Sequence, residues 1–367
     1  MKTVLISGAS IAGPALAYWL RRNGFAPTVV ERAPAPRLGG QAVDIRGAAL
    51  DVVDRMGLLD QARRVRTRMR GMTMLDGEGN EVWRSAEMTA SAGRLDSDDL
   101  ELLREDLTRL LLERTREVDY VFGDSITDLE DGVDGVRVSF EHGEPRTFDL
   151  VVGADGQHSG VRELVFGPER EFARHLGTYL AIFSAENFLN LDNWQVWFRG
   201  DAGGGGIYPV RGNREIRVTL GFEADRFDYD HRDLEAQKAL LAERLGGMRW
   251  EVPRLLKYLD QAPDFYFDSM AQIHLRQWWK GRVALVGDAG YCASALSGQG
   301  TSLALVGAYV LADELGRTDD HQAAFARYQD RLRPFVELNQ ALATENPGER
   351  ANEESIERAK NAIALDG

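Results

Sequence analysis

Three segments far apart in this 367-residue chain each place a glycine or aspartate turn directly after a short apolar run. They cover residues 4–13, 149–156 and 281–289. Apolar runs of this length suit parallel strands that are buried on both faces, and a small-residue turn at a strand end lets the backbone approach a phosphate. Together the three segments predict an α/β fold with one dinucleotide site.

The first segment has the residues of a phosphate-binding turn, which are Gly8, Ser10, Ile11, Ala12 and Gly13. A helix that begins near Ile11 would present free amides and the positive end of its dipole to a pyrophosphate. Ser10 holds the middle glycine position of the G-x-G-x-x-G pattern, which weakens the match because a side chain stands where the ligand must come close. A tight turn without a ligand is the alternative interpretation.

An acidic residue follows at the spacing that a ribose contact requires. Glu31 lies 18 residues after Gly13, behind a second apolar run at 27–30. A carboxylate there accepts hydrogen bonds from a ribose 2′-OH and disfavours a 2′-phosphate. This predicts the adenosine of FAD or NAD rather than that of NADP.

With the other two segments included, the chain resembles the single-component, class A flavoprotein monooxygenases of the para-hydroxybenzoate hydroxylase fold. Within that group it is most similar to the tetracycline-inactivating monooxygenases. The resemblance covers about residues 1–340. The second segment matches the family pattern at Asp149, Gly153, Asp155, Gly156, Ser159 and Arg162, and the third matches it at Gly287, Asp288, Ala289, Gly298, Gln299 and Gly300.

The resemblance implies a Rossmann-like FAD-binding domain of the GR2 type, an inserted antiparallel-sheet substrate domain and a C-terminal helix. The FAD-binding domain would comprise residues 1–71, 84–175 and 268–320. The substrate domain would comprise 72–83 and 176–267, and the C-terminal helical segment 321–367. The implied cofactor contacts are those of the first turn with Glu31, Arg32, Asp44, Arg104, Asp155, Gly156, Asp288, Gly298, Gln299 and Gly300.

In such enzymes noncovalent FAD is reduced by transiently bound NAD(P)H and reacts with O₂. A flavin C4a-hydroperoxide then hydroxylates a small aromatic or polyketide-like substrate. Because the flavin carries the chemistry, we assign no catalytic side chain. Arg37 is a candidate for the phosphate of the nicotinamide cofactor, and a solvated loop arginine is the alternative.

The implied roles have physical grounds. Asp288 can accept hydrogen bonds from ribityl hydroxyls, and the helix that opens at Gly298–Gly300 can stabilise negative charge on reduced flavin. Arg104 is either a charge-assisted donor to the cofactor or a solvated arginine. Asp155 is either a dinucleotide contact or a turn former and helix cap, and the two roles are compatible.

The chain departs from the family in the third segment. Relatives commonly read Gly-Asp-Ala-Ala-His with a proline a few residues later, whereas this chain has Gly290-Tyr291 and Ala295 in those places. Losing the proline removes a fixed φ, so we expect a looser loop beside the flavin.

Three aromatic residues of the predicted second domain, Trp197, Tyr208 and Phe222, are candidates for an apolar substrate wall. The alternative is that they are core residues of the sheet. Two other functions also stay open. One is a flavin-dependent dehydrogenase or reductase without oxygen transfer, and the other is a non-catalytic flavin-binding protein that sequesters a ligand.

Composition limits the partners. With 58 acidic and 44 basic residues the net charge is −14, which disfavours nucleic acid and anionic membranes. No stretch is apolar enough to span a membrane and the first residues read as a strand, so we expect a cytoplasmic protein. One cysteine, Cys292, and six scattered histidines predict no disulfide and no metal site. A monomer or a homodimer is expected.

Periodicity predicts the remaining elements. We expect an amphipathic helix over 100–115, hairpin strands over 119–138, and antiparallel strands over 179–222 interrupted by the glycine run 203–206. We also expect helices over 234–245, 252–259 and 301–315. A final helical segment over 322–364 would be broken at Pro334 and at Pro347-Gly348.

Overall fold

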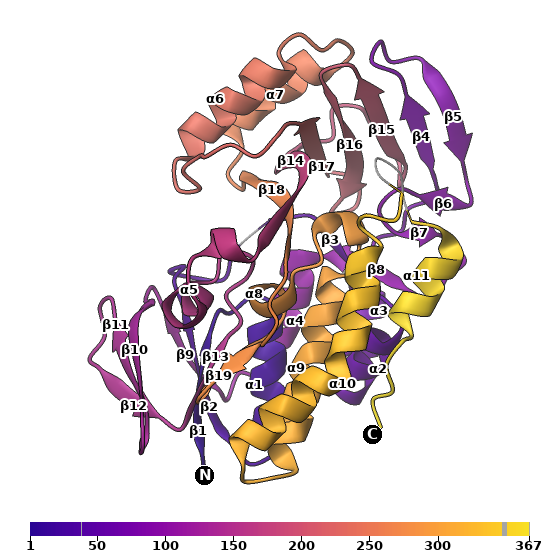
Figure 1. The fold of residues 1–367 in the computed structure, drawn as a ribbon. Coiled ribbons are helices and arrows are strands. Elements are labelled where there is room, and N and C mark those ends of the chain that lie inside the picture. Colours follow the sequence, from indigo (N-terminus) through magenta and orange to yellow (C-terminus); the bar gives the residue numbers. More distant parts are fainter. Residues whose placement is uncertain (38, 347–350, 367) are drawn as a thin grey trace.

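Two sheets form the cores of two units, which lie one above the other in Figure 1. The computed structural model describes residues 1–37, 39–346 and 351–366. The first unit holds a six-stranded sheet in the order β19-β20-β13-β1-β2-β9. The second holds a seven-stranded sheet in the order β18-β14-β17-β16-β15-β4-β5. The α/β class expected from the sequence is confirmed.

The six-stranded sheet is parallel except at its β19 edge. Val4, Leu5 and Ile6 of its central strand are buried, as their continuous apolar run predicts. The strands are β1 (Thr3–Ser7), β2 (Ala26–Glu31), β9 (Asp119–Phe122), β13 (Leu150–Gly153), β19 (Trp279–Lys280) and β20 (Val283–Leu285).

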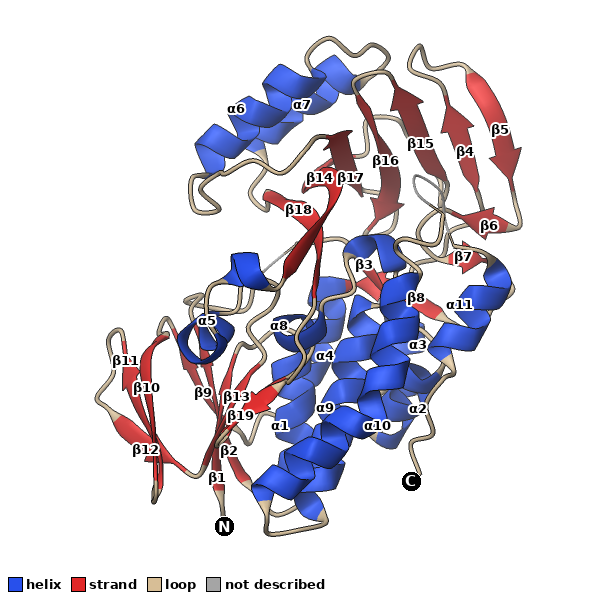
Figure 2. Ribbon diagram, viewed as in Figure 1, coloured by secondary structure: helices blue, strands red, loops and turns tan. Residues whose placement is uncertain are grey.

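Helices cover this sheet, and α9 lies between α1 and α10 (Figure 2). Small and apolar residues fill almost every position of α9, so neighbouring helices pack around it. The helices of this unit are α1 (Ala12–Arg22), α2 (Ala48–Arg55), α3 (Leu59–Val65), α4 (Arg104–Arg114), α5 (Gly160–Phe166), α8 (Asp288–Tyr291), α9 (Gly300–Gly316), α10 (His321–Ala341) and α11 (Glu353–Lys360).

The seven-stranded sheet is antiparallel except where β4 pairs with β15 in parallel, and outside two register shifts its side chains alternate between two faces. One face packs under α6 (Leu234–Leu245) and α7 (Val252–Gln261), which lie above it in Figure 2. The opposite face, here called the inner face, is turned toward the first unit. The strands are β4 (Met72–Leu75), β5 (Glu81–Ser85), β14 (Ala173–Glu186), β15 (Gln195–Gly200), β16 (Gly203–Val210), β17 (Glu215–Glu223) and β18 (Tyr266–Ile273).

Short sheets complete the fold. The hairpin expected within 119–138 is formed by residues 126–132 and 135–140, with Gly132 paired to Gly135, whereas residues 119–122 form β9 of the six-stranded sheet. These strands and the remaining short elements are β3 (Ala42–Ile45), β6 (Met88–Thr89), β7 (Gly93–Arg94), β8 (Leu100–Leu103), β10 (Ile126–Gly132), β11 (Gly135–Phe140), β12 (Arg146–Phe148), and the 3₁₀ turns η1 (Glu169–Glu171) and η2 (Ala295–Ser297).

The helix predicted over 100–115 was wrong in its first turn. Residues 100–103 form β8, which pairs with β3, and the helix begins at Arg104. All four residues of β8 are buried, so pairing with β3 decides their conformation over helix propensity. The leucines of the helix itself, Leu107, Leu110 and Leu111, are core residues as predicted.

Two predicted interruptions were also wrong. The glycine run lies inside β16, where Cβ atoms would collide with neighbours; at Gly206 a Cβ would stand 2.6 Å from the Trp197 ring. Pro334 lies inside α10, which continues through it because Leu332 and Phe335 on either side are buried. The predicted break at Pro347-Gly348 lies outside the described residues.

None of the helices in the described ranges is long and apolar enough to cross a membrane. In the same ranges no group of three or more histidine, cysteine or acidic side chains is arranged to hold a metal ion.

The side chain of Tyr291 is accommodated by a glycine of α9. Its ring is buried against Trp278, and its hydroxyl accepts a hydrogen bond from the Tyr328 hydroxyl at 3.0 Å. A Cβ on Gly307 of α9 would stand 2.0 Å from the Tyr291 Oη atom. The phenol therefore requires glycine at position 307.

We expect Gly307→Ala to lower the free energy of unfolding by about 1–3 kcal/mol, because the added methyl overpacks the core. In a Tyr291→Phe background the loss should fall close to zero, since the clashing hydroxyl is gone and alanine favours the helix by about 1 kcal/mol. Urea unfolding of wild type, the two single variants and the double variant gives the four free energies of this double-mutant cycle. An equal loss in both backgrounds would contradict this packing.

Candidate functional site

The three turns predicted from the sequence meet at the carboxyl edge of the six-stranded sheet. The chain leaves β1 for β2 on one side and leaves β13 for β20 on the other, so the strand order reverses between β1 and β13. Open α/β sheets bind ligands at such a reversal, outside the carboxyl ends of the strands. The turns after β1, β13 and β20 all lie there.

Glycines allow the backbones of these turns to touch. A Cβ on Gly8 would stand 2.5 Å from the Ala154 carbonyl oxygen, and a Cβ on Gly13 would stand 1.9 Å from the Gly8 carbonyl oxygen. A Cβ on Gly287 would stand 3.2 Å from the Ala12 Cβ atom, so the third turn packs closely against the start of α1. Gly8 and Gly13, the first and last glycines of the G-x-G-x-x-G pattern, therefore allow close backbone packing, and Ser10 in the middle position does not prevent it.

Neither helix that would face the cofactor is capped by a side chain. In the described residues the N-cap positions, Ile11 of α1 and Gln299 of α9, make no side-chain capping hydrogen bond, and neither helix has an acidic residue in its first turn. By contrast, Asp320 caps the N-terminus of α10. Uncapped amides and a positive dipole end are suited to the phosphates of a dinucleotide and to an anionic ring.

Glu31 lies beside the first turn, at the end of β2. One carboxylate oxygen accepts a hydrogen bond from the Ala9 amide at 2.8 Å and the other accepts one from the Ala33 amide at 2.9 Å. These bonds hold the carboxylate at the turn. Arg32 beside it is exposed.

Asp288 lies at the start of α8, and its carboxylate is in an unusual environment. Burial raises its pKa, and the partner found for it in the described residues is the weakly donating Cys292 thiol. A Cβ on Gly300 would lie 3.8 Å from its Oδ1 atom, so the carboxylate adjoins the N-terminus of α9. A carboxylate so placed calls for hydroxyl donors, which a ribityl chain supplies.

Gln299 lies between the two glycines at the start of α9. Its amide donates to the Ser297 Oγ atom at 3.1 Å, and both polar atoms of its fully buried side chain have no partner. Gly298, at φ +64°, would bring a Cβ within 3.6 Å of the Arg46 Nη2 atom and 3.9 Å of Asp44. Asp44 of β3 and Arg46, directly after this strand, form an ion pair of 2.8 Å.

Arg104 lies at the first position of α4 and holds the loop before β3. Its Nη2 atom donates to the Gly39 carbonyl at 2.9 Å, and a Cβ on Gly40 would collide with its Nε atom at 2.5 Å. Arg37 is exposed, and its charge lowers the pKa of Arg104 together with the larger effect of burial. The two arginines therefore lie near one another, although they come from distant segments.

Asp155 acts as the cap that the sequence suggested as one of its two roles. Its carboxylate accepts hydrogen bonds from the Ser159 hydroxyl at 2.5 Å and from the Val161 amide at 3.1 Å. Gly156 follows at φ +84°. Burial raises the pKa of Asp155. Contact with a ligand would come in addition to the hydrogen bonds that its carboxylate already accepts.

The proposed substrate wall divides between the two faces of the second sheet. Trp197 and Tyr208 lie on the inner face, and the Tyr208 hydroxyl accepts a hydrogen bond from the Ala42 amide at 2.8 Å. Phe222 lies on the opposite face, stacked on Tyr179 with ring centroids 5.5 Å apart in the core under α6 and α7. Strand alternation thus makes Phe222 a core residue and removes it from the wall.

The loop that contains Ala295, the position where the family resemblance led us to expect a proline, forms the 3₁₀ turn η2. Ser294 precedes it at φ +70°, and its carbonyl accepts a hydrogen bond from the Ser297 hydroxyl at 2.8 Å. Ala295 itself is exposed. The looser loop expected from the missing proline stays a prediction.

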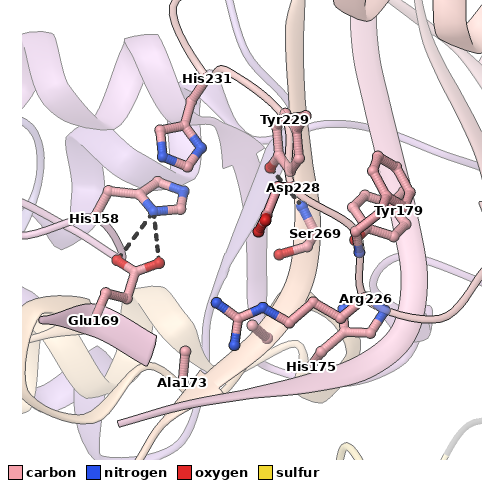
Figure 3. Close-up of a pocket in the computed structure, with 12 residues that line it drawn as sticks. His158, Glu169, Ala173, His175, Tyr179, Arg226, Asp228, Tyr229, His231 and Ser269 are labelled. Carbon is pink, nitrogen blue, oxygen red and sulfur yellow. Dashed lines mark hydrogen bonds and ion pairs between the residues drawn. The ribbon is translucent and has the colours of Figure 1, made fainter. Parts of the chain in front are cut away.

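Figure 3 shows a pocket of about 80 Å³ where the two units join. His158, next to the second turn, hydrogen-bonds Glu169 at 3.0 Å and Asp268 of β18 at 2.9 Å, and stacks on His231 with centroids 4.3 Å apart. Burial lowers the pKa of His158, but the hydrogen bonds and charges of the two carboxylates outweigh it and raise the pKa to about 10. A charged His158 therefore links the two units.

Comparison with known proteins agrees with this site. The family model described as an FAD binding domain matches residues 1–340. The chain belongs to this family. A flavin-dependent monooxygenase of Legionella longbeachae is 38% identical over 338 residues, which are 92% of this chain and 86% of the relative.

A flavin-dependent monooxygenase from an unknown prokaryotic organism is 41% identical, over 93% of this chain and 88% of its own length. Among solved structures, the tetracycline destructase Tet(55) has a TM-score of 0.87 and 38% identity, covering 100% of this chain and 99% of its own. The expected class is confirmed: the chain is an FAD-dependent monooxygenase.

Two buried polar residues of the monooxygenase site were missed from the sequence, Arg46 and Glu101. Arg46 follows Asp44 at the strand period of two, which is the one signal that could have placed both on the same face. Glu101 was hidden because its segment was assigned to a helix.

We expect Asp288→Ala to weaken FAD retention of the monooxygenase more than Asp155→Ala. The first change removes the acceptor for the cofactor, whereas the second removes a cap worth about 1 kcal/mol. Flavin content after gel filtration and thermal unfolding should be measured for both. If both variants retain equal flavin, the roles given to the two carboxylates are wrong.

The raised pKa of His158 makes stability depend on pH. Charged His158 stabilises the fold fully below its ordinary pKa of 6.5, and this contribution is lost as pH rises toward about 10. The stability that wild type gains over His158→Gln should therefore shrink between pH 6.5 and 10. A constant difference over that range, or the same shrinkage with the exposed control His142→Gln, would contradict the linkage.

Proposed function

We propose that this monooxygenase uses NAD(P)H and O₂ to hydroxylate a small aromatic or polyketide-like substrate. The observation that carries the proposal is the opposition of two surfaces. One is the N-terminal end of α9 with Asp288, where the cofactor would lie, and the other is the inner face of the second sheet with Trp197; hydrogen bonds from Arg46 and from Gln195 to Ser91 connect them. A planar apolar substrate suits a site between them.

The chain offers a fitting donor and acceptor set along the whole length of FAD. The uncapped amides from Ser10 to Gly13 would hold the pyrophosphate and Glu31 the adenosine ribose. Asp288 would hold the ribityl chain and the turn at Gly298–Gly300 the ring. Arg32, Asp44, Arg104, Asp155 and Gly156 would complete the binding site. Bound FAD would supply the electron transfer from NAD(P)H and the activation of O₂.

The side chains of the chain itself would bind, orient and exclude water. Trp197 would cover one side of an aromatic substrate, and its indole Nε1 is already bonded to Gln195 at 2.8 Å, which fixes the ring. Arg37, exposed near Arg104, would contact the nicotinamide cofactor during its transient binding. The names of Tet(51) and Tet(55), tetracycline destructases, support a polycyclic substrate.

We expect the purified protein to be yellow with about one noncovalent FAD per chain, and to consume NADH or NADPH. With ¹⁸O₂ and a panel of phenols, polycyclic aromatics and a tetracycline, one product should gain one ¹⁸O atom. Mass spectrometry of the product and peroxide release per NAD(P)H give the result, with Asp288→Ala as the control. Cofactor oxidation that yields only peroxide with every compound would favour a reductase, and bound flavin without turnover would favour a sequestering protein.

A further inference from the structure

A buried polar cluster joins the expected flavin seat to the inner face of the second sheet. Arg46, directly after β3, binds Asp44, and its Nη2 atom also donates to the Ser91 carbonyl at 3.0 Å. The Ser91 hydroxyl accepts a hydrogen bond from Gln195 at 2.6 Å, and Gln195 in turn accepts one from the Trp197 indole. Arg46 and Gln195 are buried. A chain of hydrogen bonds thus connects Arg46, which lies close to Gly298, with Trp197 of the proposed substrate wall.

Glu101 lies at the side of this cluster and is 5% exposed. It stands directly opposite Asp44 in the β3–β8 pair, so two carboxyl groups face each other across the strands. Its Oε1 atom accepts a hydrogen bond from the Thr67 hydroxyl at 2.5 Å, whereas no partner among the described residues lies within hydrogen-bonding distance of its buried Oε2 atom, and the Ser91 hydroxyl acts on the carboxyl group from nearby. A buried oxygen that lacks a donor and faces a like charge is best accommodated when the carboxyl group carries a proton.

The other groups around Glu101 agree with this arrangement. Among the described residues, the titratable and charged groups that face it are Asp44 of β3, Arg46 directly after β3 and Tyr208 of β16, while Ser91 and Thr67 offer hydroxyls. Burial, followed by the charge of Asp44, raises the pKa of Glu101 to about 7, although the hydroxyls and Arg46 act against it. Burial also raises the pKa of Tyr208, so the phenol stays neutral.

The charge of the cluster therefore depends on one proton. The net charge of the Asp44, Arg46 and Glu101 side chains becomes more positive by one unit when Glu101 binds a proton. Arg46 and Asp44 approach Gly298, where the ring of FAD would lie. Negative charge added to the cofactor on reduction would lie close to this cluster and raise the affinity of Glu101 for a proton.

We propose that Glu101 is a positioning residue of the reductive step, which binds a solvent proton when the cofactor gains negative charge and so lowers the negative charge beside the Asp44–Arg46 ion pair. The inference rests on the proposed function. NAD(P)H, oxidised to NAD(P)⁺, delivers two electrons and one proton to FAD, and the reduced cofactor keeps one negative charge. The solvent proton that balances this charge binds the Glu101 carboxylate.

The test measures how many protons the protein takes up when its FAD is reduced. FAD-loaded wild type and Glu101→Gln are reduced without O₂ in weak buffer, and an indicator dye reports proton uptake per FAD. At pH 8 wild type should take up about one proton more than Glu101→Gln, and at pH 6 the two should agree, because Glu101 is then already protonated. Glu113→Gln, which removes an exposed carboxyl group on α4, should behave as wild type.

A second readout needs neither flavin nor the Gln variant. Infrared difference spectra of the flavin-free protein should show the band of a protonated carboxyl group at pH 6, and this band should disappear as the pH rises to 8. In Asp44→Asn the change should move to lower pH, because the facing charge is gone. Equal proton uptake by wild type and Glu101→Gln, or no carboxyl signal in wild type, would overturn the inference. Failure of wild type to bind FAD would overturn the proposed function instead, and the infrared result would still decide whether Glu101 holds a proton.

Discussion

Close backbone contact at one edge of the six-stranded sheet is the constraint on which the site depends. The Gly8 turn touches the Ala154 turn, and Gly13 brings α1 against the Gly8 carbonyl, at distances that a Cβ atom would forbid. Gly287 joins the third turn to Ala12 in the same way. Three segments separated by more than a hundred residues thereby place two uncapped helix ends and the Asp288 carboxylate around one space.

The sequence was sufficient to predict the site where backbone geometry dictated residue type. Glycines that a turn requires and an acid at the end of β2 can be recognised without a structure, and the same motifs carried the family resemblance. Prediction failed where tertiary pairing decided the outcome. Residues 100–103 look helical because leucines recur at helical spacing, yet they pair with β3, and this misassignment hid Glu101. Phe222 could not be assigned to a sheet face before the register of β17 was known.

Polar contacts join the two units near the site, beside a small apolar cluster of Leu103, Tyr208 and Val210. Tyr208 binds the Ala42 amide, and Arg217, which is 2% exposed, donates to the Gly40 carbonyl at 3.1 Å. His158 binds Asp268 at the other end of the junction. Directional bonds of this kind fix the orientation of the inner face, and with it Trp197, relative to the cofactor seat. Their cost in desolvation is offset only when nearly every group is paired, which makes the unpaired Glu101 oxygen notable.

The central claim, that the three turns together seat one FAD molecule, is tested most directly by a crystal structure of the protein with FAD. The account predicts the pyrophosphate at the amides of residues 10–13, the adenosine ribose beside Glu31, a ribityl hydroxyl within hydrogen-bonding distance of Asp288, and the ring against Gly298–Gly300. A flavin bound away from Asp288 and the N-terminus of α9 would contradict it.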